Sequence, residues 1–328
     1  MAFSDKTLTI VLFSVLTGQA FAAQPADIAE QVKGLWQQKN YAGAQTLLSP
    51  LVGKKSKDAQ LLALLGQTEF LLENKEQAEE LLEKAIKYDA SNADYQHWYA
   101  TVSCNLASDA SMFSAMGYAK RCKKAYETAL QLAPSNPRSY IALGQFYAQA
   151  PAIVGGDKDK ALQLAEKLTT IDPLQGALLQ LRATDLEDSA VFDALLVKSE
   201  LLRQRPESFF QRGITLARAE KFAQAIEALQ LAIKQPATDD DAKEVIAESR
   251  YQLARCAVLG KTAVSEGIAA MQYYLDDTPD PTRLDWAKLR LAQLYVLAKE
   301  LEKANAIAKP LLAATDDDKL KAELKKIL

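Results

Sequence analysis

The 328-residue chain carries 39 Lys and Arg against 42 Asp and Glu, which gives a formal net charge of -3. This near balance gives no reason to expect nucleic acid or an anionic membrane as a partner, because both attract strongly basic surfaces. Hydrophobic residues make up 49% of the chain, enough to build a sizeable core. Beyond the first twenty residues no alternating β-branched segment of useful length occurs, so an all-α protein is expected.

The first 22 residues have the features of a secretory signal peptide. Lys6 precedes an apolar run, Leu8–Leu16, and Ala20-Phe21-Ala22 supplies a small-x-small cleavage pattern. A short membrane anchor is the alternative, but this run falls far below the roughly 20 residues that a spanning helix needs. Cleavage would leave a mature chain, residues 23–328, with no expected membrane span and a periplasmic or secreted location.

Two pairs of helices are expected in the first part of the mature chain. The apolar spacing places helices at residues 27–38 and 41–52, followed by 58–72 and 75–88. The second pair shows a sequence of large and small positions: Leu62, Leu65, Gly66, Ala78, Leu82 and Ala85. Small residues at facing positions let two helices cross closely, while large residues fill the space beside the contact.

The next two pairs contain insertions. The third pair begins at Asn92, and its second helix, which ends at Pro134, lies about ten residues later than a strict repeat would place it. The fourth pair begins at Pro137 and contains an insertion of about five residues. Insertions in a helical stack collect on one face, where function is often carried.

Later pairs are expected to start near residues 174, 206, 242 and 284, before a short closing helix that runs from Asp316-Asp317-Asp318 to Leu328. The plainest pair contains Phe209, Arg212, Gly213, Leu216, Phe222, Ala225, Leu229, Ala232 and Pro236. This order, which recurs about every 34 residues, is the tetratricopeptide pattern. We therefore expect an all-α solenoid of about eight such pairs plus a C-terminal capping helix, in a single domain over residues 23–328.

A closer resemblance covers roughly residues 60–175. A Trp-bearing helix (Asp94–Ala100) is followed by SMFSAMGYAKRCKKAYETALQLAP at 111–134 and FYAQAPAIVGGDKDKA at 146–161. These segments resemble a family of secreted bacterial tetratricopeptide proteins. The resemblance implies an exported helical-repeat protein, and it carries over no catalytic residue.

Three cysteines occur in the mature chain: Cys104, Cys122 and Cys256. In an oxidising compartment, Cys104 and Cys122, on the two helices of one pair, could form a disulfide. The alternative is that all three are small buried hydrophobic residues, and the spacing leaves both interpretations open. Because no Cys-x-x-Cys spacing occurs and His97 is the only histidine, zinc is not expected, and no cofactor is indicated.

The loop at Gly155 and Gly156 is the sharpest candidate for chemistry. Backbone amides at the start of the following helix could hold an anion, with Lys158 and Lys160 nearby. The segment lacks the Gly-Lys-Ser/Thr ending and the preceding strand of a phosphate-binding loop. A left-handed turn, followed by Asp157 as a helix cap, is the simpler interpretation.

The sequence evidence for a catalytic site or a calcium site is weaker than that for the Gly155-Gly156 loop. His97 could act as a general base, but no serine or cysteine nucleophile with a recognisable turn accompanies it. The acidic runs at residues 239–241 and 276–277 lack the Gly and Glu positions of a helix-loop-helix calcium site, so helix caps and solvated loops are the default.

In this kind of stack the first helix of each pair lines a concave groove, so the repeat register predicts which side chains face a partner. The predicted groove set mixes amides, arginines and aromatics, which suits an extended peptide with some acidic character. It consists of Gln67, Arg138, Gln145, Phe210, Ile214, Arg218, Tyr251, Arg255, Trp286 and Gln293.

These features together predict a non-catalytic periplasmic adaptor or scaffold that binds a protein or peptide of the cell envelope. A small-ligand carrier or transport accessory protein is the first alternative, and it would need the groove to close into a pore or pocket. An envelope enzyme that uses His97 as its base is the second. The repeat pattern predicts the architecture and not the partner, because one fold serves many functions.

Overall fold

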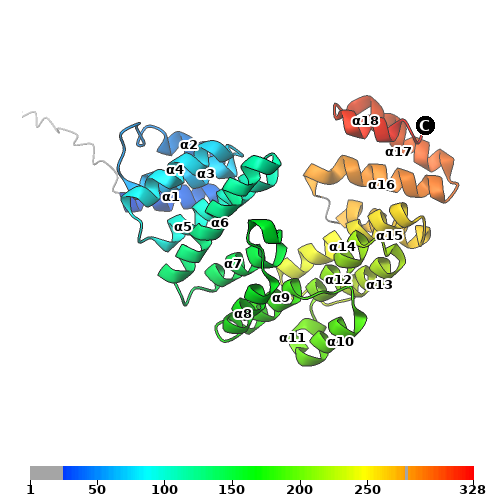
Figure 1. Ribbon diagram of the computed structural model, residues 1–328. Coiled ribbons are helices and arrows are strands. Elements are labelled where there is room, and N and C mark those ends of the chain that lie inside the picture. Colours follow the sequence, from blue (N-terminus) through cyan, green and yellow to red (C-terminus); the bar gives the residue numbers. More distant parts are fainter. Residues whose placement is uncertain (1–24, 278–279) are drawn as a thin grey trace, which may run out of the picture. The chain divides into compact units, whose positions relative to one another are not determined.

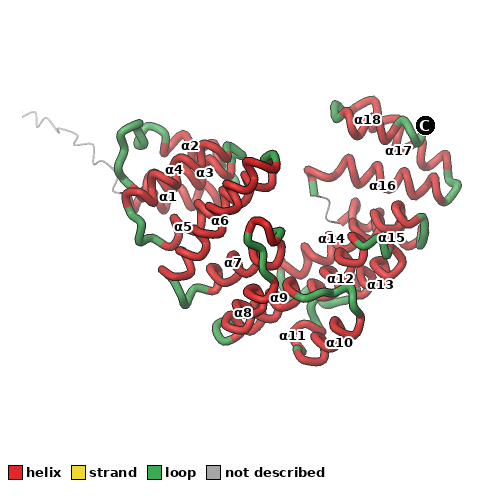
Figure 2. Tube along the Cα trace, in the orientation of Figure 1, coloured by secondary structure: helices red, strands yellow, loops and turns green. Residues whose placement is uncertain are grey.

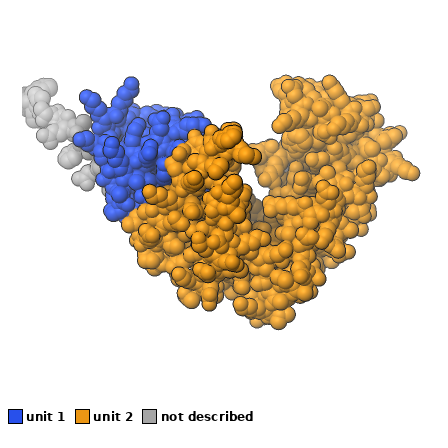
Figure 3. Space-filling model, in the orientation of Figure 1, with its two compact units in different colours: residues 1–106 blue, residues 107–328 orange. Residues whose placement is uncertain are grey.

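The computed structural model describes residues 25–277 and 280–328, and within these ranges the regular structure is entirely helical. The predicted signal peptide, residues 1–22, lies outside the described residues. Contacts along the chain separate two compact units, unit 1 up to Leu106 and unit 2 from Ala107 to Leu328 (Figure 3). The organisation of residues 23–328 as one domain stays a prediction.

Unit 1 is built from helices that pair in chain order (Figure 1). They are α1 (Pro25–Gln37), α2 (Tyr41–Leu48), α3 (Ala59–Leu71), α4 (Lys75–Tyr88) and α5 (Ala93–Asp109), of which the last continues beyond the unit's end. Polar side chains set two of the starts: the Asn40 side chain accepts from the Gly43 N–H, and that of Asp58 accepts from the Leu61 N–H.

Unit 2 is also built from helices that pair in chain order, and their lengths vary more than those of unit 1 (Figure 2). They are α6 (Met112–Leu132), α7 (Pro137–Gln149), η1 (Ala152–Val154), α8 (Lys158–Thr169), α9 (Pro173–Ala183), α10 (Ser189–Lys198), α11 (Glu200–Arg203), α12 (Pro206–Arg218), α13 (Phe222–Ile233), α14 (Asp240–Gly260), α15 (Val264–Asp277), η2 (Pro281–Arg283), α16 (Leu284–Leu297), α17 (Leu301–Ala314) and α18 (Asp318–Leu324). Over the described part of the chain this order confirms the predicted α-solenoid of eight pairs and a closing helix.

The stacking in unit 2 repeats from pair to pair. The two helices of a pair pack on each other, and the second packs on the first helix of the next pair, as α8 does on α9 and α13 on α14. First helices also contact one another in succession, from α7 through α9 and α12 to α14. A proline opens α7, α9 and α12, where the missing N–H costs no helical hydrogen bond. The first helices therefore form a continuous row, which is the geometry that a groove requires.

The helix crossing at Gly213 shows why the repeat needs small residues. A Cβ added to Gly213 would lie 2.7 Å from Cγ of Leu229 and 3.3 Å from the carbonyl oxygen of Ala225. Leu229 and Ala225 are fully buried in the core that runs from α12 to α17. Gly66 occupies the same kind of position in unit 1, where an added Cβ would lie 2.9 Å from Cγ of Leu82. Both contacts agree with the facing positions inferred from the sequence.

The first insertion lies within helices. The second helix of the third pair, α6, ends at Leu132, next to the predicted end at Pro134, and it starts at Met112 and extends over 21 residues. The extra residues therefore continue the helices, whose alanine, lysine and methionine content favours helix over loop. The second insertion, between α7 and α8, forms the short η1 and a turn at Gly155.

Arg205 ties together the loops that precede α12 and α14. Its guanidinium donates to both carboxylate oxygens of Glu207, to Asp239 and, at 2.9 Å, to Oγ1 of Thr238. Only 10% of the Arg205 side chain and 9% of the Glu207 side chain are exposed. Asp239 also caps α14 by accepting from the N–H of Ala242. This ion cluster fixes the connection between two successive pairs.

Candidate functional site

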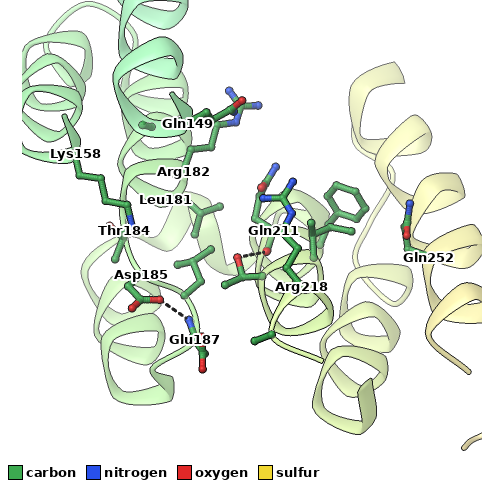
Figure 4. A pocket seen from close by; sticks show the side chains of 16 residues that line it. Gln149, Lys158, Leu181, Arg182, Thr184, Asp185, Glu187, Gln211, Arg218 and Gln252 are labelled. Carbon is green, nitrogen blue, oxygen red and sulfur yellow. Dashed lines mark hydrogen bonds between the residues drawn. The ribbon is translucent and has the colours of Figure 1, made fainter. Parts of the chain in front are cut away.

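Unit 2 contains a pocket of about 870 Å³ on its row of first helices. Its wall is made by the end of α7, the start of α8, the end of α9 with the following loop, one face of α12, and Gln252 of α14 (Figure 4). A cavity of this size lies within the range of binding pockets, about 300–1,000 Å³. The space-filling view shows that unit 2 is hollowed on the side facing the viewer (Figure 3).

One face of α12 presents three pocket residues at intervals of four. Phe210, Ile214 and Arg218 all line the pocket. Side chains four positions apart lie on the same side of a helix, and α12 buries its other side in the crossing at Gly213. These three members of the predicted groove set therefore lie on one face of α12, and their binding of a partner stays a prediction.

Three cationic side chains reach the pocket from three different helices: Lys158 from α8, Arg182 from α9 and Arg218 from α12. Figure 4 shows them at separate places around the pocket, not gathered at one point. Among the described residues, none of the three has an acidic partner within ion-pair distance. The pocket thus offers uncompensated positive charge in a chain whose formal net charge is -3.

Arg182 is the most desolvated of these cations. Burial lowers the pKa of its guanidinium, and the charge of Glu207 partly opposes that effect. Glu207 is itself engaged, because it accepts from Nε of Arg205 at 3.0 Å. Removing a cation from water is unfavourable unless an anion or hydrogen-bond acceptors replace the lost hydration. A bound anion would therefore offset the unfavourable desolvation of the Arg182 guanidinium in the unbound protein.

Two carboxylates also line the pocket, and each has an intramolecular role. Glu187 accepts from Nζ of Lys221 at 2.5 Å. Asp185 accepts from the Glu187 backbone N–H at 3.1 Å, which shapes the loop after α9. Glu187 is neutralised by Lys221, so Asp185 alone opposes the three cations.

The remaining pocket residues combine apolar surface with amides. Leu181 and Leu186 are buried, and Phe210 and Ile214 are half-buried. The amides Gln149, Gln211 and Gln252 stand at the wall, where Gln252 also donates to Glu248 at 2.8 Å. Apolar surface beside amides and cations favours a peptide, which carries side chains of both kinds.

Other predicted groove residues lie elsewhere in unit 2. Arg138 is exposed at the start of α7, and Gln145 is half-buried on the same helix. Arg255 is exposed on α14 and donates to Oε1 of Gln252 at 3.3 Å, so it adjoins the pocket through that amide. On α16, Trp286 packs on the C-terminal core, while Gln293 accepts from Arg290 at 2.7 Å. Partner binding by these residues stays a prediction.

The structure buries two members of the predicted set. Gln67, on α3 of unit 1, is 9% exposed, and so is Tyr251, on α14 of unit 2. Tyr251 belongs to the main core of unit 2, where its ring lies 5.5 Å from the Tyr274 ring, centroid to centroid. Burial corrects the expectation that these two side chains point into an open groove.

Sequence reasoning did not select Arg182 or Gln149, and it considered Lys158 only as a cation beside the Gly155-Gly156 loop. Arg182 follows Leu181, which occupies the same position after the helix-opening proline in α9 that Ile214 occupies in α12. That correspondence was a usable signal, although α9 is shorter than α12 and ends at Ala183. Lys158 lines the pocket because the turn at Gly155 places the start of α8 at the pocket wall.

The Gly155-Gly156 segment has a clear structural role. Gly155 adopts φ 102°, a left-handed conformation that side chains disfavour. A Cβ added to Gly156 would lie 1.7 Å from the carbonyl oxygen of Ala150, so the backbone there leaves no room for a side chain. Asp157 caps α8 by accepting from the Lys160 N–H at 3.1 Å, which also lowers the pKa of its carboxyl. These contacts support the turn interpretation.

The cysteines and His97 are not among the residues that line the pocket. Cys256 is a buried free thiol, and burial raises its pKa to about 11, so it is little ionised at neutral pH. Cys104 lies on α5 in unit 1 and Cys122 on α6 in unit 2, and their pairing stays a prediction. His97 is buried on α5, at 8% exposure.

Two general properties hold for residues 25–277 and 280–328. No helix there has both the length and the apolar character to cross a membrane. In the same ranges, no three His, Cys, Asp or Glu side chains gather in a way that could hold a metal ion.

Comparison with known proteins gives a family match and a shared fold. Residues 35–100 match the family model described as tetratricopeptide repeat. No curated protein is significantly similar to the sequence. Among solved structures, yeast Tom70 is 18% identical, with a TM-score of 0.56 over 88% of this chain and 58% of Tom70, so this chain spans less than two thirds of Tom70. A tetratricopeptide repeat protein from Parabacteroides merdae ATCC 43184 is 11% identical, with a TM-score of 0.51 over 92% of this chain and 98% of the other.

At these identities the structural likeness shows the fold alone. The matched region contains the crossing at Gly66, and unit 2 repeats the same crossing at Gly213. Small residues at a helix crossing, a large residue beside them and a new pair directly afterwards are the features that define this repeat. Residues 35–100 therefore match the tetratricopeptide repeat, and the chain has the α-solenoid fold of tetratricopeptide-repeat proteins.

Proposed function

We propose that this protein is a non-catalytic adaptor of the bacterial cell envelope, and that it binds a protein or peptide in the pocket of unit 2. One observation carries the proposal: three consecutive first helices, α9, α12 and α14, contribute to one open pocket whose cations have no acidic partner among the described residues. Stacks of this kind present extended binding surfaces of this sort. The envelope location rests on the predicted signal peptide at residues 1–22.

Two measurements test the two parts of this proposal. N-terminal sequencing of the exported protein should find a start near Ala23, and retention of Met1 would contradict the envelope location. Affinity capture from a periplasmic extract, with residues 23–328 as bait, should recover a defined partner. Arg218→Glu should reduce that capture, because it reverses one of the pocket charges.

A matched control separates the pocket from a general charge effect. Arg203→Glu makes the same change on α11, at an exposed residue outside the pocket lining. Its salt bridge to Glu200 is exposed and contributes little to stability. We expect this control to capture the partner as well as the wild type does. Equal capture by all three proteins would show that the partner binds elsewhere.

A small-ligand carrier is a second candidate, favoured by one observation. The pocket volume, about 870 Å³, would hold a drug-sized molecule. Native mass spectrometry of protein purified from the periplasm should then show a bound small molecule that Arg218→Glu loses. The adaptor proposal instead expects a free protein with a peptide or protein partner.

A further inference from the structure

The charge distribution of the pocket indicates which chemical class of partner it takes. We propose that it recognises an acidic peptide segment, in which carboxylate side chains contact Arg182 and Arg218 while neighbouring apolar side chains contact Phe210 and Ile214. This inference rests on the proposed function and specifies the ligand at that site.

Arg182 is the anchor of this arrangement. It comes from the last turn of α9, is half-buried, and has no ion-pair partner in the part of the chain that the structure describes. Glu207, whose charge partly opposes the effect of burial on Arg182, is held by Arg205 through two hydrogen bonds. An arginine without an internal ion pair can donate two hydrogen bonds to a ligand carboxylate, and no existing ion pair has to break first.

The spread of the cations favours several carboxylates along an extended chain. Lys158, Arg182 and Arg218 project from three helices and occupy separate places around the pocket (Figure 4). A single phosphate would gain most from cations converging on one point. Successive acidic side chains of a peptide would instead meet these cations one after another.

The apolar part of the wall favours a peptide with mixed side chains. Phe210 and Ile214 are half-buried on the same face of α12 as Arg218, which follows them at the end of the helix. Apolar ligand side chains would cover this surface, and carboxylates would lie at the Arg218 end. The amides of Gln149 and Gln211, which also line the pocket, can hydrogen-bond to a peptide backbone.

Fluorescence anisotropy with two matched peptides tests this inference. The probe is a fluorescein-labelled peptide of alternating Glu and Leu residues with an amidated C-terminus, and its match carries Gln in place of Glu. The mature wild-type chain should bind the Glu peptide and not the Gln peptide, and more weakly as salt rises. Equal binding of both peptides, or of neither, would overturn the inference.

Variants at the pocket sharpen the test. Arg182→Gln should weaken binding of the Glu peptide about 10- to 100-fold, because it removes a charge-assisted hydrogen-bond donor. Arg182→Lys should lose less, because it keeps the charge but not the bidentate geometry. Arg203→Gln, at the exposed control position, should bind as the wild type does. Thermal melting checks that each variant is folded.

One variant should bind more tightly, a result that misfolding does not produce. Asp185→Asn removes the one pocket carboxylate that lacks a cationic partner, while an amide oxygen can still accept from the Glu187 N–H. We expect roughly twofold tighter binding of the Glu peptide, or more. Weaker binding would contradict the assigned role of the pocket charges.

The two proposals fail in different ways. If the envelope partner is captured through Arg218 but the Glu and Gln peptides behave alike, the adaptor function stands and the acidic-ligand inference falls. Displacement of the Glu peptide by inorganic phosphate, but not by sodium chloride at equal ionic strength, would identify a phosphate site and also overturn the inference. If periplasmic capture recovers no partner while the Glu peptide binds, the pocket chemistry stands and the adaptor function falls.

Discussion

Substituting alanine for Gly213 tests the helix crossing on which the fold depends. Alanine raises helix propensity by about 0.8–1.0 kcal/mol relative to glycine. At Gly213, however, the new Cβ would lie 2.7 Å from Cγ of Leu229, whereas carbons in contact lie about 3.5–4.0 Å apart. Leu229 is fully buried, and its Cγ is the branch point of the side chain, not a mobile end. Relieving the overlap should cost about 1–3 kcal/mol, so Gly213→Ala should be destabilising by up to about 2 kcal/mol net.

Gly117→Ala is the matched control for this substitution. Gly117 is exposed in α6, and the nearest atom to an added Cβ is Nη1 of Arg121 at 3.8 Å, an ordinary contact. Only the propensity gain remains, so this variant should be more stable than the wild type by about 0.5–1 kcal/mol. The same residue change is therefore expected to shift stability in opposite directions at two helical positions.

Urea unfolding followed by circular dichroism measures both variants against the wild type. Gly213→Leu extends the series, because it adds three further carbons at the crossing and should be destabilising by about 3 kcal/mol or more. Ala237→Leu changes an exposed loop residue and should stay within about 0.5 kcal/mol of the wild type. If Gly213→Ala is as stable as Gly117→Ala, or Gly213→Leu as stable as Ala237→Leu, the crossing has been assigned to the wrong residue.

Three further predictions concern charges and covalent structure. Arg182→Met should leave the melting temperature unchanged or raise it, since it removes a half-buried cation that lacks an ion pair among the described residues; a clear drop would mean that this charge stabilises the fold. The hydrogen bond from Arg205 lowers the pKa of Asp239 from 3.8 to about 2, so its stabilising effect is full above about pH 4 and is lost as the pH falls through about 2. Wild type and Asp239→Asn should therefore differ most in urea stability above pH 4 and converge near pH 2, and a constant difference would refute the linkage. Mass spectrometry of non-reduced peptides from exported protein should find Cys104 linked to Cys122, a bond that stabilises by roughly 3 kcal/mol; unmodified thiols at both positions would refute it.

Helix positions and the crossings within pairs could be predicted from the sequence, because both depend on local order. Helix starts follow from prolines and capping side chains, and the Gly213 crossing follows from one small residue on each of two consecutive helices. The same periodicity placed Phe210 and Arg218 on one face of α12, and both residues line the pocket. These inferences need only the 3.6-residue helical period and a short connection.

Contacts between pairs were decided by the tertiary structure. Gly144 of α7 is an example, because the atom nearest to a Cβ added there is Cδ2 of Leu179, in the next pair, at 2.4 Å. Tyr251 occupies a groove position in the repeat, yet it packs inside the core against Tyr274. The rotation of one pair against the next is set by all the side chains between them, and no single repeat encodes it.

The pocket likewise depends partly on local sequence and partly on how the helices pack. The sequence by itself determined the stack of helical pairs and the side chains of α12 that can face a ligand. Only the tertiary structure brought Lys158 and Arg182 to the same cavity as Arg218, because this required a turn at Gly155, the end of α9 at Ala183 and the packing of α9 beside α12. A helix specifies its own faces through its period, but the faces that meet across a cavity depend on how separate helices pack.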